Sequence, residues 1–269
     1  KPTIATNLAF VASQQGQTVS YLDCDVEAPN GDIFLKPTVE NDEPIFVKVP
    51  KVDETKCIAC GQCEAICQFS AIVVMNKTVL TFPDLCHSCG GCWEVCPFGA
   101  ITQGREEIGR LQQGKAGSIE FCQGRLKIGT MMSPPVIHAV KAASDKSDIT
   151  IVDCPPGTSC PVIESVRNTD YVVLVTEPTP FGLNDLKLAV KAMRKLQLPF
   201  GVVINRANMG DSKTRDYCRD QGIPILSQIP DLRPVAEAYS RGELLSAVSE
   251  SYRFGIERLL ERIRQETTR

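Results

Sequence analysis

Short runs of apolar residues alternate with amphipathic segments over most of the chain. Continuous apolar runs occur in "ITIV" before Asp153, in "YVVLV" at 171–175 and in "GVVIN" at 201–205. Segments with apolar residues at helical spacing lie between them, such as "DLKLAVKAMRKLQ" from Asp185. An uninterrupted apolar run is typical of a strand buried on both faces, and strands that alternate with helices form parallel sheets. The pattern predicts an α/β fold with a parallel sheet that helices cover on both faces.

The two ends of the chain carry helical patterns. "TIATNLAFVASQQG" from Thr3 predicts a helix that ends at Gly16, and "TVSYL" after it predicts a buried strand running into Asp23 and Asp25. Near the C-terminus an apolar stripe predicts a helix packed on the sheet, and a membrane-surface anchor is the alternative. The stripe consists of Tyr252, Ile256, Leu259, Leu260 and Ile263.

The segment between Cys57 and Cys96 has a different character. "CIACGQCEAICQFSAI" from Cys57 returns as "CHSCGGCWEVCPFGAI" from Cys86, and half of the positions are identical. Eight of the thirteen cysteines fall in this segment. The cysteine density is below that of a disulfide scaffold, and clustered cysteines favour metal binding in a reducing compartment.

Charge and hydropathy narrow the possible partners. The formal net charge is −3, so no strong positive charge indicates binding to nucleic acid. The apolar runs are far shorter than the roughly 20 residues that a membrane-spanning helix needs. We expect a cytoplasmic protein without nucleic-acid partners or stable membrane association.

The doubled C-x2-C-x2-C-x3-C motif resembles a bacterial two-cluster ferredoxin along roughly 50 residues, in which the fourth cysteine of each motif ligates the other cluster. Zinc is the weaker alternative, because it prefers two separated C-x2-C pairs. The resemblance implies two [4Fe-4S] clusters, one held by Cys57, Cys60, Cys63 and Cys96, the other by Cys86, Cys89, Cys92 and Cys67. We expect Phe69, Met75 and Phe98 to pack the core of this small module, and His87 to be exposed.

Motifs on both sides of the cysteine segment carry a second resemblance. "KPTIATNLA", "LDCDVEAPN", "IVDCPPGT", "VTEPTP" and "VVINR" occur in the order typical of deviant-Walker-A ATPases. That group includes the Min and Par positioning ATPases, the Mrp-type iron–sulfur carriers and the nitrogenase iron protein. The chain looks most similar to MinD-like ATPases with an inserted ferredoxin. The resemblance implies a parallel-sheet P-loop NTPase domain at 1–46 and 104–269, and a small α+β ferredoxin-like domain at 47–103.

The resemblance assigns roles to individual residues. Asp25 matches the switch I aspartate that positions the attacking water, and Asp153 matches the Walker B-like carboxylate that holds Mg²⁺ through water. Gly157 in "PPGT" matches switch II, where the backbone approaches the γ-phosphate. Asn205 matches the asparagine that hydrogen-bonds adenine, and Pro230 flanks the base. Cofactors expected on this basis are ATP or ADP and Mg²⁺.

The phosphate loop departs from the family pattern. The expected motif is K-G-G-x-G-K-S/T-T before a helix, but the chain starts at Lys1 without the glycines or the preceding strand. Lys1 and Thr3 are the remaining candidates for nucleotide contacts, and Pro2 stands where the Mg²⁺ hydroxyl belongs. We expect the N-terminal strand and glycine-rich loop to be missing from the chain. A natural pseudo-ATPase is the alternative.

Several other polar residues and cysteines have less defined roles. Asp23 is interpreted as a cap of its strand rather than a direct contact, and Glu177 is treated in the same way. Cys160 lies at the offset from Asp153 at which the nitrogenase iron protein places a ligand of its dimer-bridging cluster, and Cys122 is the candidate second ligand. We expect Cys24, Cys154 and Cys218 to be core residues.

The resemblances leave three functions open. The favoured hypothesis is an ATPase, acting as a homodimer, whose nucleotide state gates electron transfer through the two clusters to a redox partner protein or a paralogous ATPase. The second is an iron–sulfur cluster assembly or carrier ATPase of the Mrp type, with clusters as cargo. The third is a MinD-like positioning ATPase with redox-sensing clusters.

Overall fold

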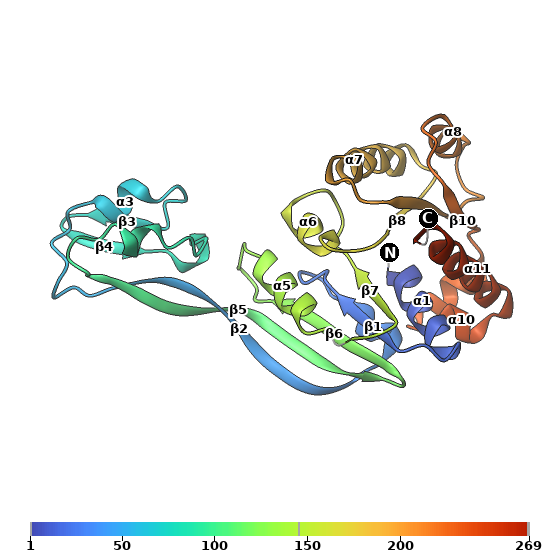
Figure 1. Ribbon diagram of the computed structural model, residues 1–269, viewed down its shortest axis with the longest axis horizontal. Coiled ribbons are helices and arrows are strands. Elements are labelled where there is room, and N and C mark those ends of the chain that lie inside the picture. The colour runs from blue at the N-terminus through green and yellow to red at the C-terminus, as the bar shows by residue number, and fades with distance from the viewer. Residues whose placement is uncertain (1, 145, 268–269) are drawn as a thin grey trace.

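The protein consists of a larger body and a small lobe, joined by a long pair of antiparallel strands (Figure 1). The computed structural model describes residues 2–144 and 146–267. In Figure 1 the lobe stands clear of the larger body at the far end of these strands. The lobe comprises α3 (Gln62–Ile66), β3 (Ile72–Met75), β4 (Thr78–Thr81), the 3-10 helix η1 (Pro83–Leu85) and α4 (Gly91–Glu94).

One sheet of the larger body has the strand order β2–β5–β6–β1–β7. Strand β1 is parallel to β6 and β7, whereas β5 is antiparallel to β2 and β6. Every residue of β1 is buried, as its apolar pattern predicts. The strands are β1 (Val19–Asp23), β2 (Thr38–Val52), β5 (Ile101–Ala116), β6 (Ile119–Leu126) and β7 (Ile149–Asp153).

Another sheet has the order β10–β9–β8, and its neighbouring strands are parallel. Its strands are β8 (Val172–Thr176), β9 (Phe200–Asn205) and β10 (Ile225–Ile229). The predicted α/β architecture with a mostly parallel sheet is confirmed. The antiparallel part is contributed by β2 and β5, which lead to the lobe.

Helices cover both faces of β1, because alternate side chains of a strand point to opposite faces. Tyr21 packs into a cluster with α1 (Pro2–Gln14) and α11 (Glu250–Thr267), whereas Leu22 packs against α5 (Pro134–Ala142). Ile256, Leu259 and Leu260 of α11 are buried in the first cluster, so the predicted packing of the C-terminal helix is confirmed. The further helices are α2 (Gly31–Leu35), α6 (Cys160–Val166), α7 (Pro180–Leu196), α8 (Lys213–Asp220), α9 (Arg233–Ser240) and α10 (Leu245–Val248). Within the described ranges no helix has the length and apolar character to cross a membrane.

Strands β2 and β5 continue past the sheet as a two-stranded ribbon. Strand β5 pairs with β6 only from Gly109 to Ala116, but it pairs with β2 as far as Ile101. The register shifts between Ile45 and Phe46, so that Ile108 is an extra residue where the ribbon leaves the sheet. We call the outer part of the ribbon, residues 46–52 and 101–108, the arm. The domain boundaries expected at residues 47 and 103 fall within it.

The core of the small lobe consists of cysteines and aliphatic residues. Cys63 and Cys92 cluster with Ile72 and Ile101. The expectation that Phe69, Met75 and Phe98 fill this core is wrong, since their exposed fractions are 42%, 55% and 46%. The cysteine side chains point inward instead and occupy the centre of the lobe. The lobe is too small to bury the large apolar side chains as well. His87 is exposed as expected and stacks on the ring of Phe69, with the ring centroids 3.6 Å apart.

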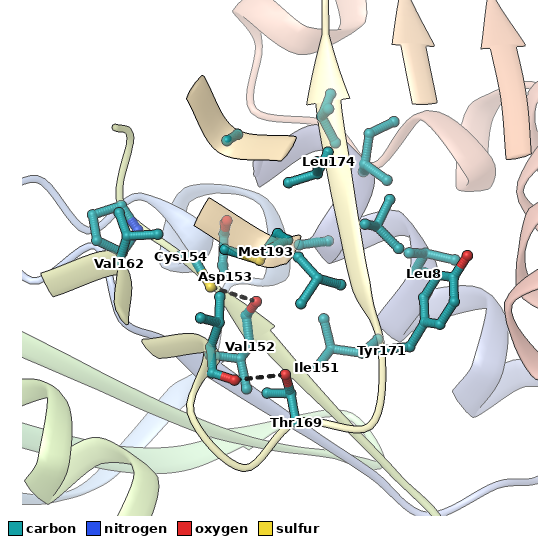
Figure 2. Close-up of a pocket in the computed structure, with 18 of the residues that line it drawn as sticks. Leu8, Ile151, Val152, Asp153, Cys154, Val162, Thr169, Tyr171, Leu174 and Met193 are labelled. Carbon is teal, nitrogen blue, oxygen red and sulfur yellow. Dashed lines mark hydrogen bonds between the residues drawn. The ribbon is translucent and has the colours of Figure 1, made fainter. Parts of the chain in front are cut away.

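The parallel sheet is interrupted between β7 and β8. Each is the last strand of its own sheet, and in the described ranges no further strand pairs with either edge. Both strands line one cavity of about 1690 Å³ along their whole length, and Leu8 of α1 forms part of another wall. Figure 2 shows Ile151 and Val152 of β7 and Leu174 of β8 around this cavity. We call this opening between two parallel strand edges the slot.

Strands β2 and β5 are packed so closely at Gly114 that a larger residue has no room there. A Cβ atom at Gly114 would lie 2.0 Å from the backbone oxygen of Thr38, whereas at Gly104 the nearest atom would be 3.3 Å away. We expect Gly114→Ala to lower the free energy of unfolding by about 1–3 kcal/mol, because backbone atoms must shift. Gly104→Ala, in the arm, is the matched control and should cost much less. Denaturant unfolding of both variants measures the difference, and equal effects would contradict the prediction.

Candidate functional site

Polar residues follow the carboxyl ends of the parallel strands, the usual position of ligand sites in such sheets. Asp23 ends β1 and Asp153 ends β7, and the register of the two strands places these residues directly opposite each other. Asp153, Gly157 and Asn205 all line the slot. The structure therefore brings together three of the residues that the sequence predicts for a nucleotide site.

Asp25 lies half-buried in the loop between β1 and α2. It is not among the residues that line the slot. The pairing of Asp23 with Asp153 nevertheless holds the start of this loop at the same edge of the sheet. The N–H of Ala28 donates to the backbone oxygen of Asp25 at 3.0 Å, which closes a turn within the loop.

Asp23 holds both ends of the loop that contains Asp25. Its Oδ1 accepts the N–H of Asp25 at 3.1 Å, and its Oδ2 accepts the N–H groups of Asn30 and Gly31 at 3.1 and 2.9 Å. The side chain is fully buried. Burial, followed by the neighbouring Asp153 carboxylate, raises the pKa of Asp23 to about 7. Asp23 therefore fixes the 25–31 loop, which is more than the strand cap that the sequence suggests.

Tyr21 contributes a contact that the sequence pattern did not reveal. Its hydroxyl donates to Oδ2 of Asp153 at 2.9 Å, and its ring stacks on Phe121 of β6 with centroids 5.8 Å apart. Burial, and then the negative charge of Asp153, raise the pKa of Tyr21 well above its usual value, so the hydroxyl stays protonated. The one sequence feature that could have indicated this contact is a tyrosine in a buried strand, because a buried hydroxyl needs a hydrogen-bond partner.

Gly157 lies in an exposed turn after Asp153. Its φ angle is +97°, a conformation that favours glycine, and no atom lies within 4 Å of the position of a Cβ. The turn leads into α6, which begins at Cys160. The backbone at Gly157 is therefore open to a ligand at the mouth of the slot.

Asn205 and Pro230 lie side by side, because Asn205 is paired with Ile229 at the ends of β9 and β10. Asn205 is half-buried, whereas Pro230 is exposed and does not line the slot. Arg206 follows Asn205, and its Nε lies 3.7 Å from carboxylate oxygens of both Glu177 and Asp231. Glu177 thus lines the slot close to an exposed arginine.

The N-terminal candidates lie on α1 or before it. Lys1 lies outside the described residues. Thr3 is half-buried in the first turn of α1, and its backbone oxygen accepts a hydrogen bond from Nδ2 of Asn7 at 2.7 Å. Ile4 and Ala5 of the same turn line the slot. The first turn of α1 therefore packs against the wall of the slot.

The first predicted cysteine set meets around one pocket in the lobe. Cys57, Cys60 and Cys63 line this pocket together with Cys96 from the second motif. Val79 and Ile101 supply apolar walls. All thirteen cysteines are free of disulfide bonds. The chain therefore brings Cys96 to the three cysteines of the other motif.

In the second predicted set, a cysteine of the first motif lies beside cysteines of the second motif. Cys67 packs against the small buried cluster that contains Cys86. Burial, with the neighbouring Cys89 and Cys67 thiols as smaller causes, raises the pKa of Cys86. Burial likewise raises the pKa of Cys92 to about 11, with Cys86 as the next cause. Cys67 of the first motif thus lies among the cysteines of the second.

The backbone repeats its conformation in the two motifs. Ala59 and Ser88 occupy equivalent positions with φ angles of 54° and 53°, and Gly61 and Gly90 have φ angles of 82° and 84°. Backbone N–H groups donate to the sulfurs of Cys57 and Cys86 at 3.4 Å, from Ala59 and Ser88 respectively. Ala71 and Ala100 donate in the same way to Cys67 and Cys96 at 3.3 Å. The two motifs therefore present their sulfurs to backbone donors in the same way, as two equivalent cluster loops would.

No group of three or more histidine, cysteine, aspartate or glutamate residues in the described ranges is close enough to hold a single metal ion. A cubane does not require such a group, because each of its thiolates binds a different iron. The sulfurs therefore have to surround a space rather than converge on a point.

The remaining five cysteines lie outside the lobe, and Cys24 and Cys122 belong to one buried cluster. Cys24 and Cys218 are buried core residues, as predicted, and Cys154 is half-buried. Cys122 is buried between β6 and α5, where its Sγ lies 3.8 Å from the backbone oxygen of Val140. Cys160 is exposed at the start of α6. The structure does not bring Cys122 and Cys160 to a common surface, as a bridging cluster would need.

Known proteins resemble this chain over different lengths. An uncharacterized protein of Methanocaldococcus jannaschii is 32% identical over 97% of this chain and 92% of its own length. An iron-sulfur cluster carrier protein of Aquifex aeolicus is 32% identical over 36% of this chain and 30% of its own length. The septum site-determining protein MinD of Pyrococcus horikoshii, solved with Mg-ADP, has a similar fold, with a TM-score of 0.58 at 16% identity over 97% of this chain and 89% of that chain.

The family comparison agrees with the geometry of the larger body. Residues 1–245 match the CobQ/CobB/MinD/ParA nucleotide binding domain. The matched range contains the β1 and β7 strand ends, both strands that border the slot and the whole lobe. The chain therefore belongs to the CobQ/CobB/MinD/ParA nucleotide binding domain family.

Proposed function

We propose that this protein is an ATP-binding iron–sulfur protein, acting as a homodimer, whose nucleotide state gates electron transfer to a partner protein. The observation that carries the proposal is the meeting of Cys57, Cys60, Cys63 and Cys96 around one pocket, at the end of an arm that leaves the nucleotide edge. The lobe is then an inserted ferredoxin-like domain. Its partner is a redox protein or a paralogous ATPase.

The residues of the lobe fit two [4Fe-4S] clusters. Cys57, Cys60, Cys63 and Cys96 would hold one, and Cys86, Cys89, Cys92 and Cys67 the other. When bound, such clusters supply one-electron transfer at potentials that hydrogen bonding and solvent exposure set. The N–H groups of Ala71 and Ala100 donate to the sulfurs of Cys67 and Cys96, and hydrogen bonds of this kind tune cluster potentials. Cys60 and Cys89 are exposed, which offers each motif a side open to a partner.

The slot supports the expectation that residues preceding Lys1 complete the nucleotide site. A parallel strand in the slot would pair with both β7 and β8, and would supply hydrogen-bond partners to the two strand edges that no described strand covers. Because α1 lines the slot, a loop from that strand to α1 would present its N–H groups at the start of a helix. Such a loop cradles phosphates. Asp153 would then hold Mg²⁺ through water, and Asp25 would position the attacking water.

Hydrogen bonds connect the Asp25 loop to the arm. The N–H of Leu126 donates to the backbone oxygen of Val26 at 2.8 Å, and the N–H of Lys127 donates to that of Ile108 at 2.8 Å. Nζ of Lys127 also lies 3.0 Å from Glu106 of the arm. The residue after Asp25 and the bulge at the base of the arm are therefore both held by the end of β6. A movement of the loop would be transmitted to the lobe through this end.

The second candidate function is cluster assembly or transfer. Its support is the partial similarity to proteins named as iron-sulfur cluster carriers, which covers 36% of this chain for the Aquifex aeolicus protein. A cargo cluster needs exposed and incomplete ligation, which the exposed Cys160 fits better than the lobe does. Transfer of clusters to an apo-ferredoxin, without an effect of ATP on redox potential, would favour this function. ATP-dependent binding to liposomes would instead favour a positioning ATPase.

The cluster assignment predicts a crossed effect of cysteine substitutions. Anaerobically purified protein should contain about eight irons and eight sulfides per chain, as two cubanes require. Cys96→Ser should alter the same EPR signal as Cys57→Ser, and Cys67→Ser the same signal as Cys86→Ser. Cys218→Ser, at a buried core position of α8, is the control and should leave both signals intact. Stoichiometric zinc, or four irons, would contradict the assignment.

The nucleotide site predicts a large difference between two forms of the chain. A polypeptide that begins at Lys1 should bind Mg-ATP at least 100-fold more weakly than one that carries its preceding strand and glycine-rich loop. The reason is the loss of several hydrogen bonds to charged phosphates, each worth about 1.5–3 kcal/mol. Calorimetry on both forms measures this difference. Micromolar affinity in the form beginning at Lys1 would refute the prediction.

Coupling predicts that ATP changes the redox behaviour of the lobe. We expect Mg-ATP to shift a cluster potential in the full-length protein, and a shift of 60 mV corresponds to about 1.4 kcal/mol for one electron, within the usual range of allosteric coupling. Lys127→Met should reduce this shift, because it removes the contact with Glu106. Lys213→Met, which removes an exposed ion pair with Asp211 on the larger body, is the control. Redox titrations with and without Mg-ATP give the answer, and an unchanged potential in the parent would exclude coupling of this kind.

A further inference from the structure

Tyr21 connects two parts of the candidate nucleotide site that are distant in sequence. Its hydroxyl donates to Oδ2 of Asp153 at 2.9 Å. Its ring lies against Gly31, where a Cβ atom would come within 2.5 Å of Cε1 of Tyr21. The side chain therefore touches the carboxylate at the end of β7 and the end of the loop that contains Asp25.

Both contacts are held firmly by the surroundings of Tyr21. The residue is fully buried, and its ring stacks on Phe121 of the neighbouring strand. Gly31, against which the ring packs, donates its N–H to Oδ2 of Asp23 at 2.9 Å. Displacement of the ring would thus disturb the Asp153 carboxylate and the Asp23 contacts with the loop at the same time.

We propose that Tyr21 is a positioning residue, which sets the orientation of the Asp153 carboxylate for Mg²⁺ and ties it to the Asp25–Gly31 loop. The inference rests on the proposed nucleotide site, but assigns a role that the sequence motifs do not contain. A hydrogen bond from a buried hydroxyl fixes one carboxylate oxygen, so that the carboxylate loses less freedom when it binds the hydrated ion. The ring then makes loop position and carboxylate orientation depend on each other.

Two substitutions separate the hydroxyl from the ring. Tyr21→Phe removes the hydrogen bond and keeps the contact with Gly31. Gly31→Ala keeps the hydroxyl but forces the ring to move, although residue 31 is not a proposed nucleotide contact. Tyr252→Phe is the matched control, because Tyr252 packs against the same core cluster from α11 and lies outside the slot.

The experiment uses the full-length protein. Mn²⁺ binding in the presence of ATP is followed by EPR, and the Mg²⁺ dependence of ATP hydrolysis is measured in parallel with thermal unfolding. Tyr21→Phe should raise the half-saturating Mg²⁺ concentration about 5- to 10-fold, as expected for the loss of one hydrogen bond to a charged group. Gly31→Ala should produce the same change in metal dependence, and Tyr252→Phe should produce none.

A purely structural role of Tyr21 would lower the unfolding temperature and leave the metal dependence unchanged, and that result would overturn the proposal. A metal defect in Tyr21→Phe but not in Gly31→Ala would overturn the link to the loop. If the parent chain binds no Mn²⁺-ATP, the proposed nucleotide function itself fails. A parent that binds normally, with a Tyr21→Phe variant identical to it, refutes the role of Tyr21 alone.

Discussion

The parallel pairing of β1 with β6 and β7 is the constraint on which the candidate site depends. This pairing places Asp23 opposite Asp153 and buries both carboxyl groups at one edge. Two buried carboxyl groups are tolerated only where hydrogen bonds compensate for lost hydration. Three backbone N–H groups and the Tyr21 hydroxyl provide such bonds. The same bonds fix the loop that contains Asp25, so that the burial of Asp23 and the position of this loop are linked.

The arm extends this constraint over a long distance. Strand β6 pairs with β1 on one side and with β5 on the other, and β5 continues into the arm without a break. Among the described residues of the arm, the strand pairing is regular except at one β-bulge. This bulge is at Ile108, where β5 leaves β6. Bulges bend and twist a ribbon, so this position sets the direction in which the lobe projects. The lobe is therefore held away from the larger body at the far end of the ribbon (Figure 1).

The lobe and the larger body differ in how directly the sequence predicted them. The repeated cysteine spacing predicted two equivalent loops, and the φ angles at Ala59 and Ser88 show that the loops share one conformation. Local spacing suffices there, because each loop is built from neighbouring residues. The core of the lobe was assigned wrongly, since hydrophobicity suggested buried positions for Phe69 and Phe98. In so small a volume the cysteines take the central positions, and the aromatic rings remain at the surface.

For the larger body, the apolar runs predicted β1, β7, β8 and β9, because strand formation is a local property of apolar, β-branched sequence. The motifs also predicted that Asp153 and Asn205 belong to one site. The sequence did not predict the contact of Tyr21 with Asp153, nor the hydrogen bonds that Asp23 accepts from both ends of the 25–31 loop. The Tyr21 contact depends on the register between strands more than one hundred residues apart in the chain, and register is set by packing across the whole sheet rather than by any local pattern. The Asp23 hydrogen bonds span at most eight residues, but they depend on the folded path of the loop, which no periodic pattern encodes. The slot between β7 and β8 is also a product of tertiary structure, because an opening between two strand edges becomes visible only when both edges are placed in space.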